Sequence, residues 1–359
     1  MTNTKRFALV TGATGWLGMG LVNALANGLA EHPDLAVPQK NLTIRCLVPP
    51  GQNTAELRRI SDSLEIVEGD VTKPESLARF FTYAGEAVLY HCAGVIHPKR
   101  VRDFYAINTQ GTTNVYAKAA GVKVRRAVIV SSNSPCGNNP HPDHLFDEKS
   151  PYNPYMGYGR SKMLMEQSVW KLHGRGNAPE TVIIRAPWFY GPFQPARQTE
   201  FFRMIRDGKV PLVGSGINRR SMAYIDNLTQ GLLLAGSVEG IDGETYWIAD
   251  TQTYSMAMIL DTIESVLCGD FFIPCKGTRL KLPSIAADIA QGIDYALQKA
   301  GAYNQKIHVL SEMNKTIACS VEKAVKELGY RPAVNLREGI RRSIAWLLDQ
   351  PEEKARLIR

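Results

Sequence analysis

The segment YMGYGRSKMLME (155–166) places a tyrosine, Tyr158, four residues before a lysine, Lys162. On a helix, residues four positions apart share one face, so both side chains can point into the same site. A free tyrosine titrates near pH ~10, and a neighbouring ammonium group stabilises the phenolate and lowers that pKa. The pair could act as acid and base, or it could be the polar side of a surface helix. A catalytic interpretation requires a cofactor site upstream and a hydroxyl group at the end of a neighbouring strand.

A glycine-rich turn supplies the candidate cofactor site. Gly12, Gly15 and Gly18 follow the first apolar run, FALV (7–10), and precede a segment with helical spacing, MGLVNALANGLA (19–30). Such a turn lets the backbone approach a pyrophosphate, and the following helix offers unpaired N–H groups and its positive dipole end. This strand–turn–helix context predicts dinucleotide binding. The same predicted cofactor site includes Thr14, Trp16 and Leu17.

The first half of the chain alternates short apolar runs with helical segments. This alternation predicts an α/β fold of the Rossmann type, with a doubly wound parallel sheet and helices on both faces. Ligands bind such a sheet beyond the carboxyl ends of its strands, where the candidate residues fall. The expected strands are 7–10, 43–48, 64–70, 87–94, 124–132 and 181–187.

The pattern becomes irregular after residue 186, where proline and aromatic residues accumulate in PWFYGPFQP (187–195). A chain of 359 residues suggests about two domains. We expect an NAD(P)-binding domain and a smaller, mixed α/β C-terminal substrate domain. The first would comprise 1–186 rejoined by 223–250, and the second 187–222 with 251–359.

The adenosine end of the cofactor site is less typical. The second strand ends in LVPPGQ (47–52), without the acidic residue that usually holds the ribose hydroxyls of NAD. This absence favours NADP slightly over NAD. Arg45, Arg58 and Arg59 are candidate contacts for the additional phosphate of NADP, although simply solvated arginines explain them equally well.

Together these motifs resemble the extended short-chain dehydrogenase/reductase superfamily, also called the NAD-dependent epimerase/dehydratase family. The resemblance covers nearly the whole chain, and the motifs occur in the expected order. AGVIHP (93–98), YIDN (224–227) and the tail are most similar to the 3β-hydroxysteroid dehydrogenase-like branch. The matching motifs are TGATGWLG (11–18), GDVT (69–72), HCAG (91–94), YAINTQGTTN (105–114), VSSNSPCG (130–137), the tyrosine–lysine pair, FYGP (189–192) and ELGYRPAVNLREGIRRSIAWL (327–347).

The resemblance implies roles for individual residues. Tyr158 would be the acid and base, and Lys162 would also hold the nicotinamide ribose. Ser132 would hydrogen-bond the substrate oxygen. Asn108 would position a water in a proton relay to Lys162, or else make only a local cap. Alternatives to Ser132 are its neighbours Ser131 and Ser134. Further implied cofactor contacts are Asp70, Val71, Ala93, Gly94 and Pro187.

These groups fit hydride transfer between a nicotinamide and a secondary alcohol or ketone. Dehydratases of the superfamily carry an Asp-Glu pair where this chain has Asn133 and Ser134, so 4,6-dehydration is disfavoured. The alternative is an NDP-sugar epimerase with retained NAD, because Arg220 lies where sugar-nucleotide enzymes hold a pyrophosphate. Asn227, in place of a second acid, argues against it. A non-catalytic NAD(P)-sensing regulator is a third hypothesis, opposed by the retained tyrosine and lysine.

The substrate itself is indicated only by class. We expect Ser134, Tyr190 and Arg220 to contact it. The segment PWFYGPFQPARQTEFF (187–202) would line the pocket, and its aromatic residues suggest a bulky substrate that is partly apolar or nucleotide-linked. The same aromatic residues could equally form a core between the domains.

Composition limits the other classes of function. The six cysteines are scattered without a C-x-x-C pair, which predicts reduced thiols, no metal site and a cytoplasmic enzyme. The net charge of +8 comes from short basic groups, so we expect no nucleic-acid partner. No apolar run is long enough to span a membrane, and polar residues interrupt 281–301. A homodimer is expected by analogy with the superfamily.

Overall fold

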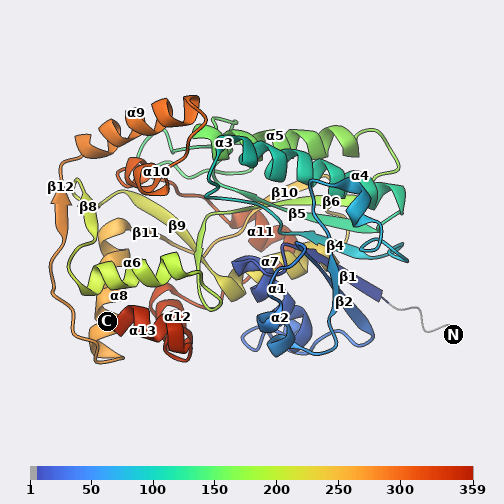
Figure 1. Cartoon of the computed structure of the whole chain (residues 1–359), viewed down its shortest axis with the longest axis horizontal. Helices are drawn as coiled ribbons and strands as arrows, with labels where there is room; N and C mark the ends of the chain where they lie inside the picture. Colours follow the sequence, from blue (N-terminus) through green and yellow to red (C-terminus); the bar gives the residue numbers. More distant parts are fainter. Residues whose placement is uncertain (1–5, 359) are drawn as a thin grey trace.

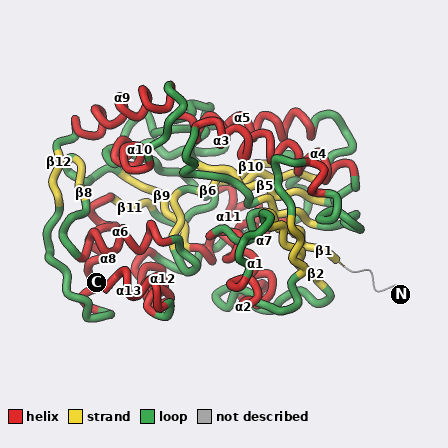
Figure 2. Tube along the Cα trace, in the orientation of Figure 1, coloured by secondary structure: helices red, strands yellow, loops and turns green. Residues whose placement is uncertain are grey.

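The structure is a computed structural model that describes residues 6–358. Its centre is a seven-stranded sheet in the order β10-β6-β5-β4-β1-β2-β3, and every neighbouring pair is parallel (Figures 1 and 2). The predicted doubly wound fold is confirmed. The strand order reverses at β1, which creates the crevice where dinucleotides bind in such sheets. The strands of this sheet are β1 Arg6–Thr11, β2 Leu42–Val48, β3 Glu65–Glu68, β4 Val88–His91, β5 Arg126–Ser132, β6 Glu180–Ala186 and β10 Glu244–Trp247.

Helices cover both faces of the sheet (Figure 1). Because side chains alternate along a strand, successive residues of β1 enter different cores. Leu9 joins the cluster that contains Met165, whereas Val10 joins the cluster that contains Leu21. The helices of this half are α1 Trp16–Asn27, α2 Ala55–Ile60, α3 Val101–Asp103, the π-helix η3 Phe104–Gly111, α4 Thr112–Gly121, α5 Met156–His173 and α7 Ile225–Ser237, with short 3-10 turns η1 Pro33–Leu35 and η2 Pro74–Leu77.

The C-terminal half is mixed, as predicted. A three-stranded sheet has the order β11-β9-β7, and β12 pairs with β8. The α9–α10 hairpin lies above these strands in Figure 1, and α6, α8, α12 and α13 lie below them. The elements are β7 Trp188–Tyr190, α6 Ala196–Arg206, β8 Pro211–Val213, β9 Arg219–Tyr224, β11 Thr253–Ser255, α8 Met256–Gly269, β12 Leu280–Leu282, α9 Ile285–Lys299, α10 Gln305–Glu312, α11 Glu322–Leu328, α12 Leu336–Leu348 and α13 Pro351–Ile358.

Two features of the sheet half were not specified by the sequence patterns. One is the π-helical geometry of η3, inside the long segment expected to be helical; π-helical turns are frequent at functional sites. The other is β10, which extends the sheet beyond β6. Over residues 6–358, no helix is both long enough and apolar enough to cross a membrane.

Candidate active site

The predicted tyrosine and serine meet at the carboxyl end of β5. Tyr158 lies in the first turn of α5, and its phenol lies near the side chain of Ser132, the last residue of β5. Burial raises the pKa of Tyr158 to about 12, although the nearby Ser132 side chain opposes this shift. The phenol is therefore protonated at neutral pH and can donate a proton to an oxygen placed beside it.

The neighbouring serines have different partners. The Ser131 hydroxyl donates to Glu166, because alternate residues of a strand face opposite sides of the sheet. The Ser134 hydroxyl lies 3.3 Å from that of Ser132, and the Ser134 amide donates to the Ser132 oxygen at the same distance. Ser132 and Ser134 therefore lie side by side at the end of β5, whereas the Ser131 hydroxyl is held by Glu166 of α5.

Lys162 points towards the same strands but does not contact the phenol in this structure. Its Nζ donates to the Val130 carbonyl at 2.7 Å and lies 3.3 Å from the sulfur of Met165. Burial lowers the pKa of Lys162 to about 8, although the charge of Glu166 opposes this shift. The sequence-based expectation that the ammonium lowers the pKa of Tyr158 is therefore not met here, because burial dominates the titration of both groups.

Lys162→Met is expected to stabilise the protein by about 2–3 kcal/mol at neutral pH, because methionine keeps the buried stem and removes the buried charge. The pKa of Lys162 is lower in the folded protein than in the unfolded chain. The destabilisation caused by its buried charge is therefore complete below pH ~8 and is lost as the pH rises above ~10. Urea unfolding at both pH values measures the difference. Lys171→Met, at the exposed end of the same helix, is the control and should change stability little. Equal stability of wild type and Lys162→Met at neutral pH would contradict the assignment of a buried charge.

The glycine turn has the shape that a pyrophosphate requires. Gly12 has φ +67°, and a Cβ there would lie 2.7 Å from the backbone nitrogen of Ala93. A Cβ on Gly18 would lie 2.0 Å from the Gly12 carbonyl oxygen. Gly15 is exposed at the N-terminus of α1, and no side chain among the described residues caps that terminus. The first-turn N–H groups of α1 can therefore receive an anion. Thr14, Trp16 and Leu17 belong to this turn and the start of α1.

The other predicted cofactor residues lie at neighbouring strand ends. The Asp70 carboxylate accepts hydrogen bonds from both the amide and the hydroxyl of Thr72, which fixes the turn after β3. Val71 packs closely against Gly111 of η3. The Ala93 amide, just beyond β4, donates to the Thr11 hydroxyl at 3.2 Å. The remaining positions are Gly94, which is exposed after β4, and Pro187, which is buried after β6.

The three arginines considered for an NADP phosphate already have partners. Arg45 is buried, with its Nε 2.8 Å from Glu65 and its Nη1 donating to backbone carbonyls. Arg58 donates to the backbone after α2, and Arg59 pairs with Glu56. The structure therefore does not support their proposed role at the tip of β2.

Asn108 has a well-defined structural task. Its side-chain amide accepts from the Val95 amide at 2.8 Å and donates to the Val95 carbonyl at 3.0 Å. It also donates to the Ser161 hydroxyl on α5. Asn108 therefore fixes the loop after β4 against α5. Within residues 6–358, no hydrogen bond joins it to Lys162, so its role in a proton relay remains a prediction.

Two of the predicted substrate contacts differ in accessibility. Tyr190 is not accessible to a substrate, because its side chain is fully buried and its hydroxyl donates a hydrogen bond to Asp250 at 2.8 Å. Arg220 is largely buried and donates to the Glu312 carbonyl. Burial lowers the pKa of Arg220, and its Nε has no hydrogen-bond partner among the described residues. A negatively charged or carbonyl-bearing ligand could satisfy this group.

A group of aromatic residues near Tyr158 was not found from the sequence. Phe104 of η3 lies 5.9 Å from the Tyr158 ring, centroid to centroid, and 5.3 Å from the ring of Tyr303. The Tyr303 hydroxyl hydrogen-bonds His97 Nδ1 at 2.7 Å. Tyr303 comes from the turn between α9 and α10, so no short motif could have placed it near Tyr158.

The same hairpin carries a buried histidine–aspartate pair. His308 Nδ1 lies 2.7 Å from the Asp294 carboxylate, and both side chains are buried. Although burial lowers the pKa of His308, its hydrogen bond with Asp294 and the charge of Glu312 raise it overall. The pair joins α9 to α10 and therefore holds Tyr303 in place.

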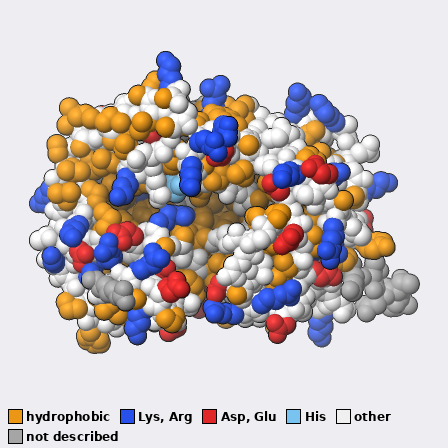
Figure 3. Space-filling model, viewed as in Figure 1, with side chains coloured by type: hydrophobic (Ala, Val, Ile, Leu, Met, Phe, Trp, Pro, Cys, Tyr) orange, Lys and Arg blue, Asp and Glu red, His pale blue; other side chains and the backbone are white. Residues whose placement is uncertain are grey.

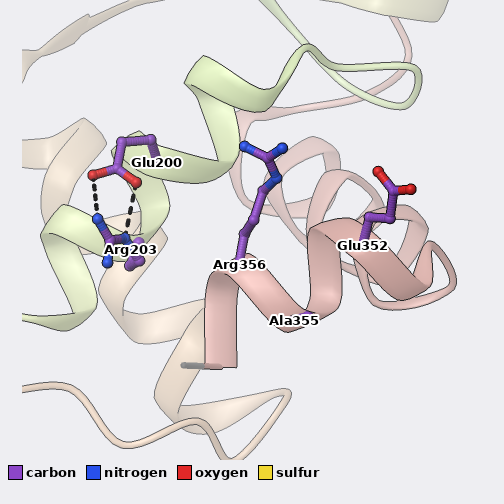
Figure 4. Close-up of a pocket in the computed structure, with 5 residues that line it drawn as sticks. All are labelled: Glu200, Arg203, Glu352, Ala355 and Arg356. Atoms are coloured by element: carbon purple, nitrogen blue, oxygen red, sulfur yellow. Dashed lines mark hydrogen bonds and ion pairs between the residues drawn. The ribbon is translucent and has the colours of Figure 1, made fainter.

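The surface is hollowed between the half that carries the sheet and the half that carries α6 and α9 (Figures 1 and 3). Hydrophobic side chains form the walls of this hollow, and lysine and arginine side chains lie at its rim (Figure 3). A separate pocket lies between α6 and α13 (Figure 4). It is lined by Glu200, Arg203, Glu352, Ala355 and Arg356, none of which is a predicted site residue. This pocket is therefore separate from the candidate active site.

Three comparisons place the chain among known proteins. It is 52% identical, over 96% of each chain, to the uncharacterized protein y4nL of Sinorhizobium fredii. It is 27% identical to 3beta-hydroxysteroid-dehydrogenase/decarboxylase isoform 1 of Arabidopsis thaliana, over 96% of this chain and 80% of that protein. The UDP-glucose 4-epimerase structure from Thermotoga maritima has a TM-score of 0.74 at 18% identity, and the match covers 96% of this chain and 99% of that one.

The family comparison agrees with the fold and with the order of the motifs. The matched region runs from the first strand to the end of the seven-stranded sheet, and it includes both the glycine turn and the tyrosine–lysine pair. Residues 8–249 match the model of the NAD dependent epimerase/dehydratase family, and the chain belongs to that family.

Proposed function

We propose that this protein is a nicotinamide-dependent oxidoreductase that transfers hydride between the cofactor and a secondary alcohol or ketone. The observation that carries the proposal is the position of Tyr158 near Ser132 at the carboxyl end of β5. β5 is separated from the glycine turn after β1 only by β4. An extended dinucleotide bound at the turn can therefore place its nicotinamide beside the phenol.

The bound nicotinamide supplies or accepts the hydride at the substrate carbon. In reduction, Ser132 donates a hydrogen bond to the substrate oxygen and Tyr158 Oη transfers its proton to that oxygen. In oxidation, the phenolate of Tyr158 accepts the hydroxyl proton. Lys162 would leave the Val130 carbonyl to hold the nicotinamide ribose, and there its charge would stabilise the phenolate. The pKa of Tyr158, raised by burial to about 12, keeps the phenol in the acid form that reduction requires.

The cofactor we propose is NAD. A 2′-phosphate requires a cation at the tip of β2, but that tip is Pro49, Pro50 and Gly51, and the Glu68 carboxylate accepts from the Gly51 amide at 3.3 Å. Glu68 would repel the added phosphate. The hydroxysteroid dehydrogenase named among the relatives supports an apolar secondary alcohol or ketone as substrate.

NADH is expected to bind at least about tenfold more tightly than NADPH. The 2′-phosphate of NADPH would lack a cationic partner at the tip of β2, and one such charge-assisted contact is worth about a factor of ten in affinity. Titration of the cofactor fluorescence on purified protein measures both affinities. Gln52→Arg, which adds a cation at the exposed tip of β2, should improve NADPH binding and leave NADH binding nearly unchanged. Tighter binding of NADPH by the wild type would contradict this choice of cofactor.

An NDP-sugar epimerase is the second candidate. The observation that favours it is the partly buried Arg220, whose Nε has no hydrogen-bond partner among residues 6–358. Such a group suits bidentate recognition of a phosphate. One assay separates the two functions. Purified protein is mixed with NADH and a panel of ketones that includes a 3-ketosteroid, and separately with UDP-sugars followed by NMR. Net oxidation of NADH by a ketone supports the oxidoreductase. A new sugar stereoisomer without net cofactor consumption would overturn it.

A further inference from the structure

The exposed face of α9 is apolar in an unusual way. Ile285, Ile289 and Ile293, spaced by four residues, are 61%, 57% and 48% exposed. The residues that α9 turns inward include Ala287 and Ala290, which are buried. Helices normally bury their large aliphatic side chains, but here the alanines are inside and the isoleucines are outside. The isoleucine row, which we call the α9 face, therefore has a use other than packing within this chain.

The α9 face is uninterrupted by charge. Gly292 and Ala296 are exposed on the same side of the helix as the isoleucines. In Figure 3, hydrophobic side chains gather at the upper left, where Figure 1 shows α9. Both acidic residues of α9 have a partner: Asp288, which is exposed next to Ile289, pairs with Lys315 at 2.8 Å, and Asp294 is buried with His308. Neither carboxylate therefore stands alone beside the isoleucine row.

Basic residues flank the α9 face. Lys281 precedes the helix, Lys299 ends it and Lys306 lies in the first turn of α10; all three are exposed. The chain as a whole carries a net charge of +8. An aliphatic row flanked by lysines fits the boundary between the acyl chains and the anionic headgroups of a bilayer. Four or five half-exposed side chains offer on the order of 300 Å², well below the ~800 Å² that each partner buries in a standard protein interface.

We propose that α9 docks this protein on an anionic membrane surface, with the helix lying in the plane of the bilayer and its isoleucine row in the lipid. The same hairpin carries Tyr303, whose ring contacts Phe104 beside Tyr158. Docking would hold the substrate hollow next to the lipid, from which an apolar alcohol or ketone could enter. This last step rests on the proposed function, whereas the docking itself does not.

Sedimentation with vesicles tests the docking. Wild-type protein should bind vesicles of phosphatidylcholine mixed with phosphatidylglycerol, bind pure phosphatidylcholine vesicles more weakly, and lose affinity in high salt. Replacing an exposed isoleucine by asparagine should weaken binding roughly tenfold, and the double variant I289N/I293N roughly 100-fold. The matched control is Val325→Asn on α11, where the valine is 47% exposed but α11 packs against α7 and β10. The control should bind like the wild type.

Three results would overturn the proposal: no binding to the anionic vesicles at low salt, equal binding of wild type and double variant, or a wild-type dimer that the double variant converts to a monomer in analytical ultracentrifugation. The last result would assign the face to a second copy of the chain. Tyr158→Phe should bind vesicles normally. Failure of the ketone assay with intact vesicle binding would therefore remove only the proposed activity, and the reverse result would remove only the docking.

Discussion

Tyr158→Phe is expected to lower kcat for ketone reduction by at least ~10³-fold while the affinity for NADH stays within a few-fold. The substitution removes only the hydroxyl that lies near Ser132 and would protonate the substrate oxygen. The ring keeps its contact with Phe104, so the site should keep its shape. Steady-state kinetics and cofactor titration on the same preparation measure the two quantities.

Tyr155→Phe is the matched control. Tyr155 lies three residues earlier and is buried, and its hydroxyl hydrogen-bonds Ser311 on α10. Its loss should leave kcat within a few-fold of the wild type. Comparable rates for wild type and Tyr158→Phe would show that the proton comes from another group. Loss of NADH binding in Tyr158→Phe would show instead that the substitution disturbs the cofactor site.

Glu166→Gln is expected to destabilise the fold by about 3–5 kcal/mol, because it leaves the buried guanidinium of Arg185 without a counter-charge. Both side chains are buried and their nearest charged atoms are 2.7 Å apart. Glu166 also accepts from the hydroxyls of Ser131 and Tyr152, so it ties α5 to β5 and β6. Urea unfolding followed by circular dichroism measures the loss.

Two further variants test the cause of that loss. Glu200→Gln breaks the exposed pair with Arg203 and should cost less than about 1 kcal/mol. The double variant Glu166→Met with Arg185→Met removes both buried charges and should be clearly more stable than Glu166→Gln alone. A Glu166→Gln variant as stable as Glu200→Gln would contradict the importance of the buried pair for holding α5.

The sequence predicts those parts of the site that lie within single strand–turn–helix units. The glycine turn, Ser132 at the end of β5 and Tyr158 on α5 each combine a local motif with a strand or helix that periodicity reveals. Parallel strands bring their carboxyl ends to one edge, so the meeting of these residues follows from the fold class. All six expected strands occur in the sheet, with ends that differ by a few residues.

Long-range partners explain where the predictions and the structure differ. Tyr190 belongs to an aromatic motif, but Asp250, which accepts the hydrogen bond from its hydroxyl, lies 60 residues away in the sequence. Arg45 occupies the middle of β2, and only the pairing with β3 places Glu65 beside it. The pKa values of Tyr158 and Lys162 depend on burial, which spacing on a helix cannot reveal.

The residues of the α9–α10 hairpin show the same limit. Tyr303 reaches the site only because α9 and α10 fold back over η3 and α5, and its partner His97 belongs to a loop after β4.

The sequence did carry a signal for the buried ion pair between Arg185 and Glu166. Arg185 interrupts the apolar strand TVIIRAP, and a charge within a buried strand requires a partner.

Transfer of deuterium from NADH labelled at the transferable position tests the central claim most directly. The wild type and the best ketone from the panel are incubated with labelled NADH, and the product alcohol is analysed by mass spectrometry. We predict one deuterium on the carbinol carbon for each NADH oxidised, and almost no labelled product with Tyr158→Phe. Unlabelled product, or equal labelling by the variant, would contradict direct hydride transfer assisted by this tyrosine.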